Sequence, residues 1–192
     1  LIYKTVSGNT RAIRHNDVLR AYVMTIAIFY VLFAITIISR GQCNSWQDIT
    51  INPIFQIVST ITSTGYSSVN YEAWGPFVLA LMFVLMFTGA CAGSTSGGAK
   101  IDRLLYLIKN CRNEIYRCIH PNAILSVRIN GKVINPDIVS KVIAFLCIYM
   151  LLIVAGGLTL SAFDVPLIDS FFSAFSCISN TGLGAGVTGY GS

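Results

Sequence analysis

Charged side chains are scarce in this sequence. Thirteen Lys and Arg residues and eight Asp and Glu residues make up 11% of the 192 positions, while 54% are apolar; an ordinary soluble domain is about a quarter charged. Too few charges remain to build a soluble surface, and so apolar a chain is not expected to be disordered. Six scattered cysteines are too few for a disulfide scaffold. The sequence therefore predicts an integral membrane protein.

Lysine and arginine are missing from long parts of the chain. Only Arg40 lies between Arg20 and Lys100, and no Lys or Arg follows Lys141. A basic nucleic-acid-binding surface would not alternate with uncharged runs of about 20 residues, the length that spans a bilayer. Membrane proteins keep Lys and Arg on the cytoplasmic side. We therefore expect both basic blocks inside the cell and the region from Arg40 to Glu72 outside.

The ends of the sequence carry no targeting signal. The chain begins at Leu1 without the segments of a signal peptide and stops at Ser192, just after a Gly-rich stretch. We expect it to be a piece of a longer protein.

Three stretches predict membrane crossings. Residues 21–39 are 19 uncharged positions, about 28 Å of helix at 1.5 Å per residue, and predict a spanning helix over 20–40. A similar run predicts a second spanning helix over 138–163. Because the outer region and the second basic block lie on opposite sides, one crossing must join them, and residues 74–99 supply it.

Two further apolar stretches are too short to span. Charge parity requires each to enter and leave on the same side, so we predict re-entrant pore half-helices over 53–62 and 167–178. Pro53 suits a first helical turn, and Asp169 lies near a helix N-terminus, where negative charge is favourable. The alternative is a pair of helices lying on the membrane surface.

The two halves align at an offset of 117 positions. Phe55 then meets Phe172, and Thr64-Gly65 meets Thr181-Gly182. The repeat predicts three regions: a third pore repeat over 1–99, a cytoplasmic helix and hairpin over 100–137, and a truncated fourth repeat over 138–192. The fold class is all-α integral membrane, built from repeated helix, re-entrant half-helix and helix units.

The segments that follow the half-helices, 62–67 and 179–184, can form an ion filter. Extended backbone at membrane depth must be buried or line water, and a ring of carbonyl oxygens can replace the water shell of K⁺ or Na⁺. Glycine allows the backbone angles that this needs. The candidate filter residues are Thr62, Ser63, Thr64, Gly65, Tyr66, Ser179, Asn180, Thr181, Gly182 and Leu183. We expect K⁺ at Ser63, Thr64, Asn180 and Thr181, in a potassium-channel-like pore.

The second helix of the first unit is interrupted by ten small residues, 89–98. Such a run cannot hold a stable helix, and we predict a flexible intramembrane gate below the filter. The gate residues are Gly89, Gly93, Ser94, Thr95, Ser96, Gly97, Gly98 and Lys100. The alternative is a close-packed helix crossing through Gly93-x-x-x-Gly97.

Residues 101–119 have helical amphipathic spacing, and residues 126–134 alternate around Asn130-Gly131, a strong hairpin signal. A basic hairpin would suit a cytosolic partner or anionic lipid heads. His120 beside Cys118 is a poor metal site. No catalytic triad or carboxylate pair appears, so we expect no enzyme and no organic cofactor.

The sequence resembles the Trk/Ktr/HKT superfamily of potassium transporters. It is most similar to the family of TrkH, the membrane subunit of the bacterial Trk system. The resemblance rests on residues 63–67, 89–100, 120–122 and 127–132 and covers about residue 10 to the end, the last two of four repeats. Thr181 and Leu183 depart from the family pattern, which expects a small apolar residue and a proline at these two positions.

The resemblance implies K⁺ uptake across the bacterial plasma (inner) membrane, with K⁺ as the bound and transported ion. It also implies a homodimer and a cytosolic nucleotide-binding regulatory subunit, called TrkA. The alternative function is a secondary transporter with broken helices that moves sodium or another small substrate.

Overall fold

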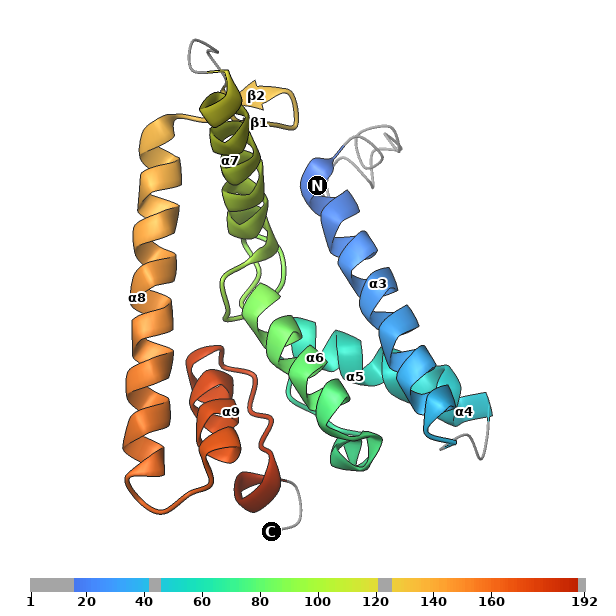
Figure 1. The fold of residues 1–192 in the computed structure, drawn as a ribbon. Helices are drawn as coiled ribbons and strands as arrows, with labels where there is room; N and C mark the ends of the chain where they lie inside the picture. The colour runs from blue at the N-terminus through green and yellow to red at the C-terminus, as the bar shows by residue number, and fades with distance from the viewer. Residues whose placement is uncertain (1–15, 42–45, 121–125, 190–192) are drawn as a thin grey trace.

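The computed structural model describes residues 16–41, 46–120 and 126–189 (Figure 1). Most of these residues lie in helices, and the one sheet is a two-stranded hairpin within this part of the chain. The elements in chain order are α3 (Asp17–Ser39), α4 (Trp46–Ile49), α5 (Ile51–Ile61), η1 (Tyr71–Trp74), α6 (Pro76–Thr88), α7 (Ile101–Ile119), β1 (Arg128–Ile129), β2 (Lys132–Val133), α8 (Pro136–Ser161), α9 (Leu167–Ile178) and η2 (Gly186–Thr188).

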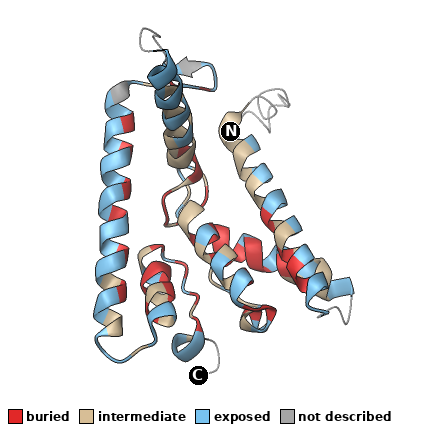
Figure 2. Ribbon diagram, viewed as in Figure 1, coloured by how far each residue is buried: buried red, intermediate tan, exposed pale blue. Residues whose placement is uncertain are grey.

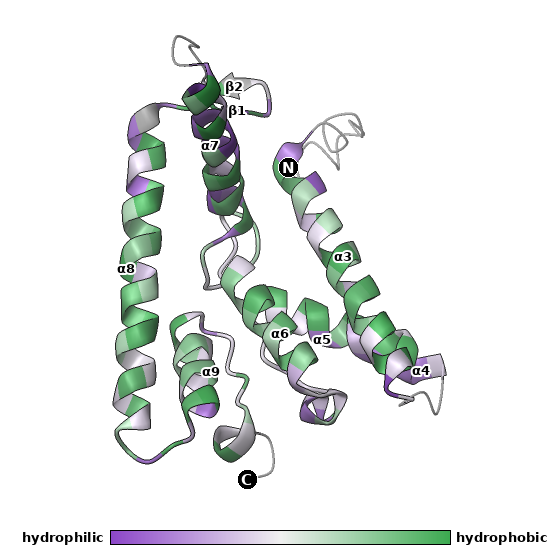
Figure 3. Cartoon of the chain, viewed as in Figure 1, coloured by the Kyte–Doolittle hydropathy of each residue, from purple (hydrophilic) through white to green (hydrophobic). Residues whose placement is uncertain are grey.

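Helices α3 and α8 are long and apolar enough to cross a membrane. Asn16 caps α3 by accepting hydrogen bonds from the next backbone N–H groups, and Asn135 caps α8 in the same way. Along α8 most outward side chains are both exposed and apolar, as Figures 2 and 3 show together; Ile148 and Leu151 are 61% and 67% exposed. Such a surface suits lipid and would be costly in water.

The short helices lie where the apolar pattern predicted half-helices. Helix α9 begins and ends at the predicted residues, and α5 begins two residues earlier than predicted, at Ile51. In Figure 1, α9 lies beside the half of α8 that is nearer the C-terminus of that helix. Gly157 permits this approach, because a Cβ there would lie 2.7 Å from the ring of Phe171.

Helix α6 ends at Thr88, so the predicted crossing over 74–99 is helical only in its first part. Its 13 residues reach about 20 Å. The chain then runs without helix until α7 begins at Ile101. This observation excludes the close-packed helix crossing that was the alternative interpretation of the glycine-rich run.

A continuous core joins the two halves of the chain. Side chains that are fully or almost fully buried fill the space where α3, α5 and α6 meet: Phe33, Ile37, Ile57, Ile61, Val78, Met82 and Leu85. From α6, Phe83 reaches α9, with its ring centroid 4.4 Å from that of Phe175. The core therefore holds the C-terminal ends of α5 and α9, and the segments that follow them, in fixed relative positions.

The predicted hairpin forms at the end of the molecule opposite these segments. Strands β1 and β2 pair antiparallel, with Arg128 opposite Val133. Asn130 and Gly131 both have positive φ, 51° and 76°, as a tight two-residue hairpin turn requires. Figure 1 shows the hairpin beside the C-terminal part of α7.

Candidate functional site

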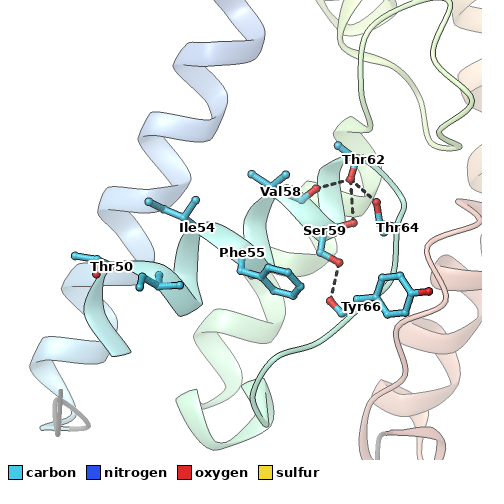
Figure 4. A pocket seen from close by; sticks show the side chains of 9 residues that line it. Thr50, Ile54, Phe55, Val58, Ser59, Thr62, Thr64 and Tyr66 are labelled. Atoms are coloured by element: carbon cyan, nitrogen blue, oxygen red, sulfur yellow. Dashed lines mark hydrogen bonds between the residues drawn. The ribbon is translucent and has the colours of Figure 1, made fainter. Parts of the chain in front are cut away.

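The segment after α5 turns back along its own half-helix (Figure 4). The Thr62 hydroxyl donates to the carbonyl of Val58 at 2.6 Å and lies 2.8 Å from the Thr64 hydroxyl. The Thr64 N–H donates to the carbonyl of Ser59 at 2.9 Å. Further on, the Ser59 hydroxyl donates to the carbonyl of Tyr66 at 2.6 Å. The hydroxyl groups thus bind the segment to the helix.

The segment after α9 makes the same turn. The Ser179 hydroxyl donates to the carbonyl of Phe175 at 2.7 Å and lies 2.9 Å from the Thr181 hydroxyl. The Thr181 N–H donates to the carbonyl of Ser176 at 2.9 Å. Each of these atoms lies 117 positions after its counterpart. One bond differs, because the buried Ser176 hydroxyl has no partner among the described residues.

Left-handed backbone occurs at matching places in both segments. Ser63 and Gly65 have φ of 55° and 78°, and Asn180 and Gly182 have φ of 52° and 81°. This conformation is unfavourable for Ser and uncommon for Asn. In a regular strand successive carbonyls point to opposite sides, whereas a φ that alternates in sign turns them toward the same side. Stored strain of this kind is typical of ion- and ligand-binding segments.

The two segments touch each other. A Cβ added to Gly65 would overlap the carbonyl oxygen of Thr181, so only glycine allows this approach. A small cavity of about 110 Å³ lies between the segments, and both Gly65 and Gly182 line it. The structure therefore brings the predicted filter residues of the two halves, distant in sequence, to one place.

Side chains from η1, in the first half, and from α9 hold the chain that follows the second segment. The Tyr71 hydroxyl donates to the carbonyl of Gly184, and a Glu72 carboxylate oxygen accepts from the Gly186 N–H at 2.8 Å. Asp169 accepts from the Val187 N–H at 3.2 Å. The sequence around Tyr71 and Glu72 does not indicate this role, because nothing near them in the chain signals a contact more than 110 residues away.

The protonation state of Tyr71 suits this role. Burial raises the pKa of Tyr71 to about 12, and the neighbouring Glu72 acts in the same direction, while the bond to Gly184 opposes both. The phenol therefore keeps its proton near neutral pH and remains a donor.

The glycine-rich loop lies against the second segment. A Cβ added to Gly97 would overlap the carbonyl oxygen of Ser179, a residue with no exposed surface. The Ala99 N–H donates to the carbonyl of Phe87 at 2.9 Å, so the loop closes on the end of α6. The Lys100 ammonium donates to the carbonyl of Ser94 at 3.1 Å. All the predicted gate residues belong to this one loop.

Ligands for a metal centre are not brought together. Within residues 16–41, 46–120 and 126–189, no group of three His, Cys, Asp or Glu side chains could hold a metal ion. His120 and Cys118 are both exposed, and His120 contacts the ring of Tyr116.

Two helices that are long and apolar enough to cross a membrane, together with two short apolar helices and their hydroxyl-rich return segments, are features of a helical membrane protein. The chain belongs to the TrkH family of cation transport proteins, whose pattern it matches over residues 15–190.

Several known proteins are similar to this chain. The Trk system potassium uptake protein TrkG of Escherichia coli (strain K12) is 32% identical over 167 residues, which cover 83% of this chain and 34% of that protein. TrkH of the same strain is 34% identical over 139 residues, 72% of this chain and 29% of that protein. TrkI of Halomonas elongata is 28% identical over 190 residues, 98% and 38% respectively.

The fold is similar to a solved structure as well. The crystal structure of the potassium transporter TrkH from Vibrio parahaemolyticus matches with a TM-score of 0.87 and 26% identity, covering 98% of this chain and 41% of that one. The chain thus spans about a third of the length of the curated relatives it matches.

Proposed function

We propose that this chain forms part of a pore for potassium uptake across the plasma membrane, with residues 62–66 and 179–183 as two sides of a carbonyl filter. The observation that carries the proposal is the contact between Gly65 and the carbonyl of Thr181, made by two segments with matching hydrogen bonds. Relatives named as potassium uptake proteins support K⁺ as the ion. Within the filter, K⁺ binds near Ser63, Thr64, Asn180 and Thr181.

The distribution of polar residues gives the proposed orientation. The polar ends of α3, α7 and α8 gather at one end of the molecule (Figure 3), and we assign this end to the cytoplasm because it carries the Lys and Arg residues. The opposite end holds Asp48, Glu72, Asp164 and Asp169 against the single Arg40. This outer end would give cations a mildly negative entrance.

The loop over residues 89–100 is the proposed gate. It lies directly against Ser179, and residues 89–98 all have small side chains, so few large side chains hinder its movement. Lys100, held by the carbonyl of Ser94, would lie at the cytoplasmic mouth. An ion that leaves the filter would have to pass this loop.

Two segments do not close a ring, and α5 shows where others would join. A cavity of about 560 Å³ opens beside α5 and is lined by Ile51, Ile54, Phe55 and Val58 together with Thr62, Thr64 and Tyr66 (Figure 4). Exposed apolar side chains next to filter hydroxyls suit packing against the other repeats of a longer polypeptide. The homodimer and a TrkA-like cytosolic nucleotide-binding subunit are further parts of this proposal.

Glycine substitutions test the filter in the full-length protein. Gly65→Ala and Gly182→Ala both place a Cβ on left-handed backbone, at a cost of roughly 1–2 kcal/mol. Only Gly65→Ala also overlaps the carbonyl of Thr181. We expect rubidium uptake, measured in cells that lack other potassium uptake, to fall about tenfold for Gly182→Ala, as 1.4 kcal/mol implies, and further for Gly65→Ala.

Gly41→Ala is the matched control. Gly41 has φ of 66°, and no atom of the described residues lies within 4 Å of an added Cβ, so alanine there carries the same backbone strain away from the filter. Uptake should be kept in this variant at equal membrane abundance. Normal uptake and K⁺ preference in Gly65→Ala would contradict the proposed filter.

A further inference from the structure

The basic end of the molecule contains a cleft that is separate from the proposed filter and gate. It has a volume of about 400 Å³ and lies between α7 and the hairpin. Its lining is polar and basic: Lys109, Arg112, Asn113, Tyr116, Ser126, Val127 and Arg128. Four of these residues, at positions 109, 112, 113 and 116, share one face of α7, since side chains three, four and seven apart point the same way along a helix.

Among the described residues, three cations line this cleft and no carboxylate does. The carboxylate of Asp17 lies nearby, and its negative charge is paired with Lys109. The Lys109 ammonium donates to it at 2.9 Å, and the Asn130 N–H donates to it at 3.2 Å. Lys109 also donates to the carbonyl of Arg128 at 2.8 Å, which leaves one of its three N–H groups available.

The two arginines of the cleft are free to bind an anion. Within the described part of the chain, the guanidinium groups of Arg112 and Arg128 make no hydrogen bond or ion pair. On the same helix, by contrast, Arg117 pairs with Glu114 at 2.9 Å, and Arg103 lies 4.0 Å from the ring centroid of Phe145. Positive charges around one cavity repel each other unless an anion enters it.

The cleft lies at the level where lipid headgroups begin in the proposed orientation. Leu104 and Leu107 of α7 pack beside Val142 and Leu146 of α8, where the uncharged run of α8 starts. Arg112 is five residues beyond Leu107, about 7 Å along the helix. The headgroup layer is roughly 5–8 Å thick on each side of the hydrocarbon core.

We propose that this cleft binds a phosphate group, supplied by an anionic lipid headgroup of the inner leaflet or by a soluble phosphate compound. The planar fork of arginine matches phosphate oxygens in pairs. The Tyr116 and Ser126 hydroxyls and the Asn113 amide supply neutral donors from the same lining. The assignment to lipid headgroups rests on the orientation given with the proposed function. The site lies apart from the filter, however, and its binding can be measured without any ion flux, so failure of one is distinguishable from failure of the other.

The test uses the full-length protein in neutral detergent and native mass spectrometry of bound molecules. The probes are phosphatidic acid, phosphatidylglycerol, phosphatidylcholine as the uncharged lipid, and inorganic pyrophosphate. We expect anionic lipid to remain bound, and Arg112→Gln/Arg128→Gln to reduce the bound fraction about tenfold, because two charge-assisted hydrogen-bonding groups are lost. Arg112→Lys/Arg128→Lys keeps the positive charges but loses the planar guanidinium groups. Its bound fraction should lie between those of the wild type and the glutamine variant.

Arg117→Gln is the matched control, since it removes one positive charge from the same helix outside the cleft. Anionic lipid without pyrophosphate binding identifies the headgroup as the source, and pyrophosphate binding identifies a soluble phosphate. Equal loss in Arg117→Gln, or no preference for anionic lipid and no pyrophosphate binding, overturns the proposal. So does binding of only an acidic partner protein that the double variant releases. Unchanged elution on size exclusion confirms that each variant folds.

Discussion

The segment after α9 is positioned by individual hydrogen bonds from residues that lie outside both filter segments. The segment after α9 is held by Tyr71 and Glu72, which belong to the other half of the chain, so the two halves fix each other. The bond from Tyr71 requires its proton. Since its pKa is raised to about 12 from 10.0, the stability that the fold gains from the neutral phenol is complete below pH 10 and is lost as the pH rises toward 12.

Removing one oxygen atom tests this bond. Tyr71→Phe keeps the ring and its packing but leaves the Gly184 carbonyl without its donor, at a net cost of about 1 kcal/mol. We expect rubidium uptake to fall about fivefold, with weaker discrimination against sodium, because the second segment gains freedom to move. Uptake in competition with sodium measures both effects.

Tyr66→Phe is the control for the same chemical change within the filter segment itself. The Tyr66 side chain is 72% exposed, and its hydroxyl makes no hydrogen bond within the described residues. Its uptake should match the wild type. Equal loss in both variants would mean that the Tyr71 bond has no special role.

Among the elements, the interruption between α6 and α7 lies directly against the second filter segment. The loop is held by its own hydroxyls, with the Ser94 and Ser96 oxygens 2.7 Å apart, and by backbone bonds to the end of α6. At Gly97 it meets the carbonyl of Ser179 so closely that no side chain fits. The loop can therefore close against the filter with little bulk, and a single methyl group there should displace it.

We expect Gly97→Ala to raise rubidium flux under conditions in which the wild-type protein is closed. The added Cβ overlaps backbone that cannot give way, so the loop has to leave its place against Ser179. Deletion of residues 93–97 should have the same effect more strongly. Ala92→Ser, at an exposed position of the same loop, should leave closed-state flux unchanged. Rubidium flux is measured in proteoliposomes under these closed-state conditions. Wild-type flux in both Gly97→Ala and the deletion would exclude a gate in this loop.

The bounds of several helices could be predicted from the sequence, whereas the contacts between distant segments could not. Periodicity predicted α7 and α9 with the same end residues, because amphipathic spacing and flanking Gly or Pro act locally. Small residues correctly predicted that the helix stops near Gly89. The contact of Gly97 with Ser179, and that of Tyr71 with Gly184, join residues about 80 and 110 positions apart. No local pattern carries such contacts, since the core of α3, α5, α6 and α9 produces them.

For the whole molecule, the proposed pore depends on how often the chain crosses the membrane. Helices α3 and α8 are long enough to cross, while α5 and α9 have 11 and 12 residues, about 17 Å each, half of the hydrocarbon core. Their segments return along the same helix, as the bonds of Thr64 and Thr181 require. The residues before and after each short helix should therefore lie on the same side.

Cysteine labelling of the full-length protein in intact cells tests this topology. After replacement of the native cysteines, single cysteines are placed at four exposed positions that flank the short helices: Trp46, Ser68, Phe163 and Val187. We expect a membrane-impermeant maleimide to label all four from outside. A variant that keeps only Cys118, exposed on α7, should react only after permeabilisation.

The experiment distinguishes two ways in which the predicted topology could be wrong. If α5 crossed the membrane, Trp46→Cys and Ser68→Cys would react from opposite sides. If α9 crossed, Phe163→Cys and Val187→Cys would differ in the same way. Either result would place the filter segments on different faces of the bilayer, and a ring of carbonyls from the two halves could then not form, because the contact of Gly65 with Thr181 requires both segments at one depth.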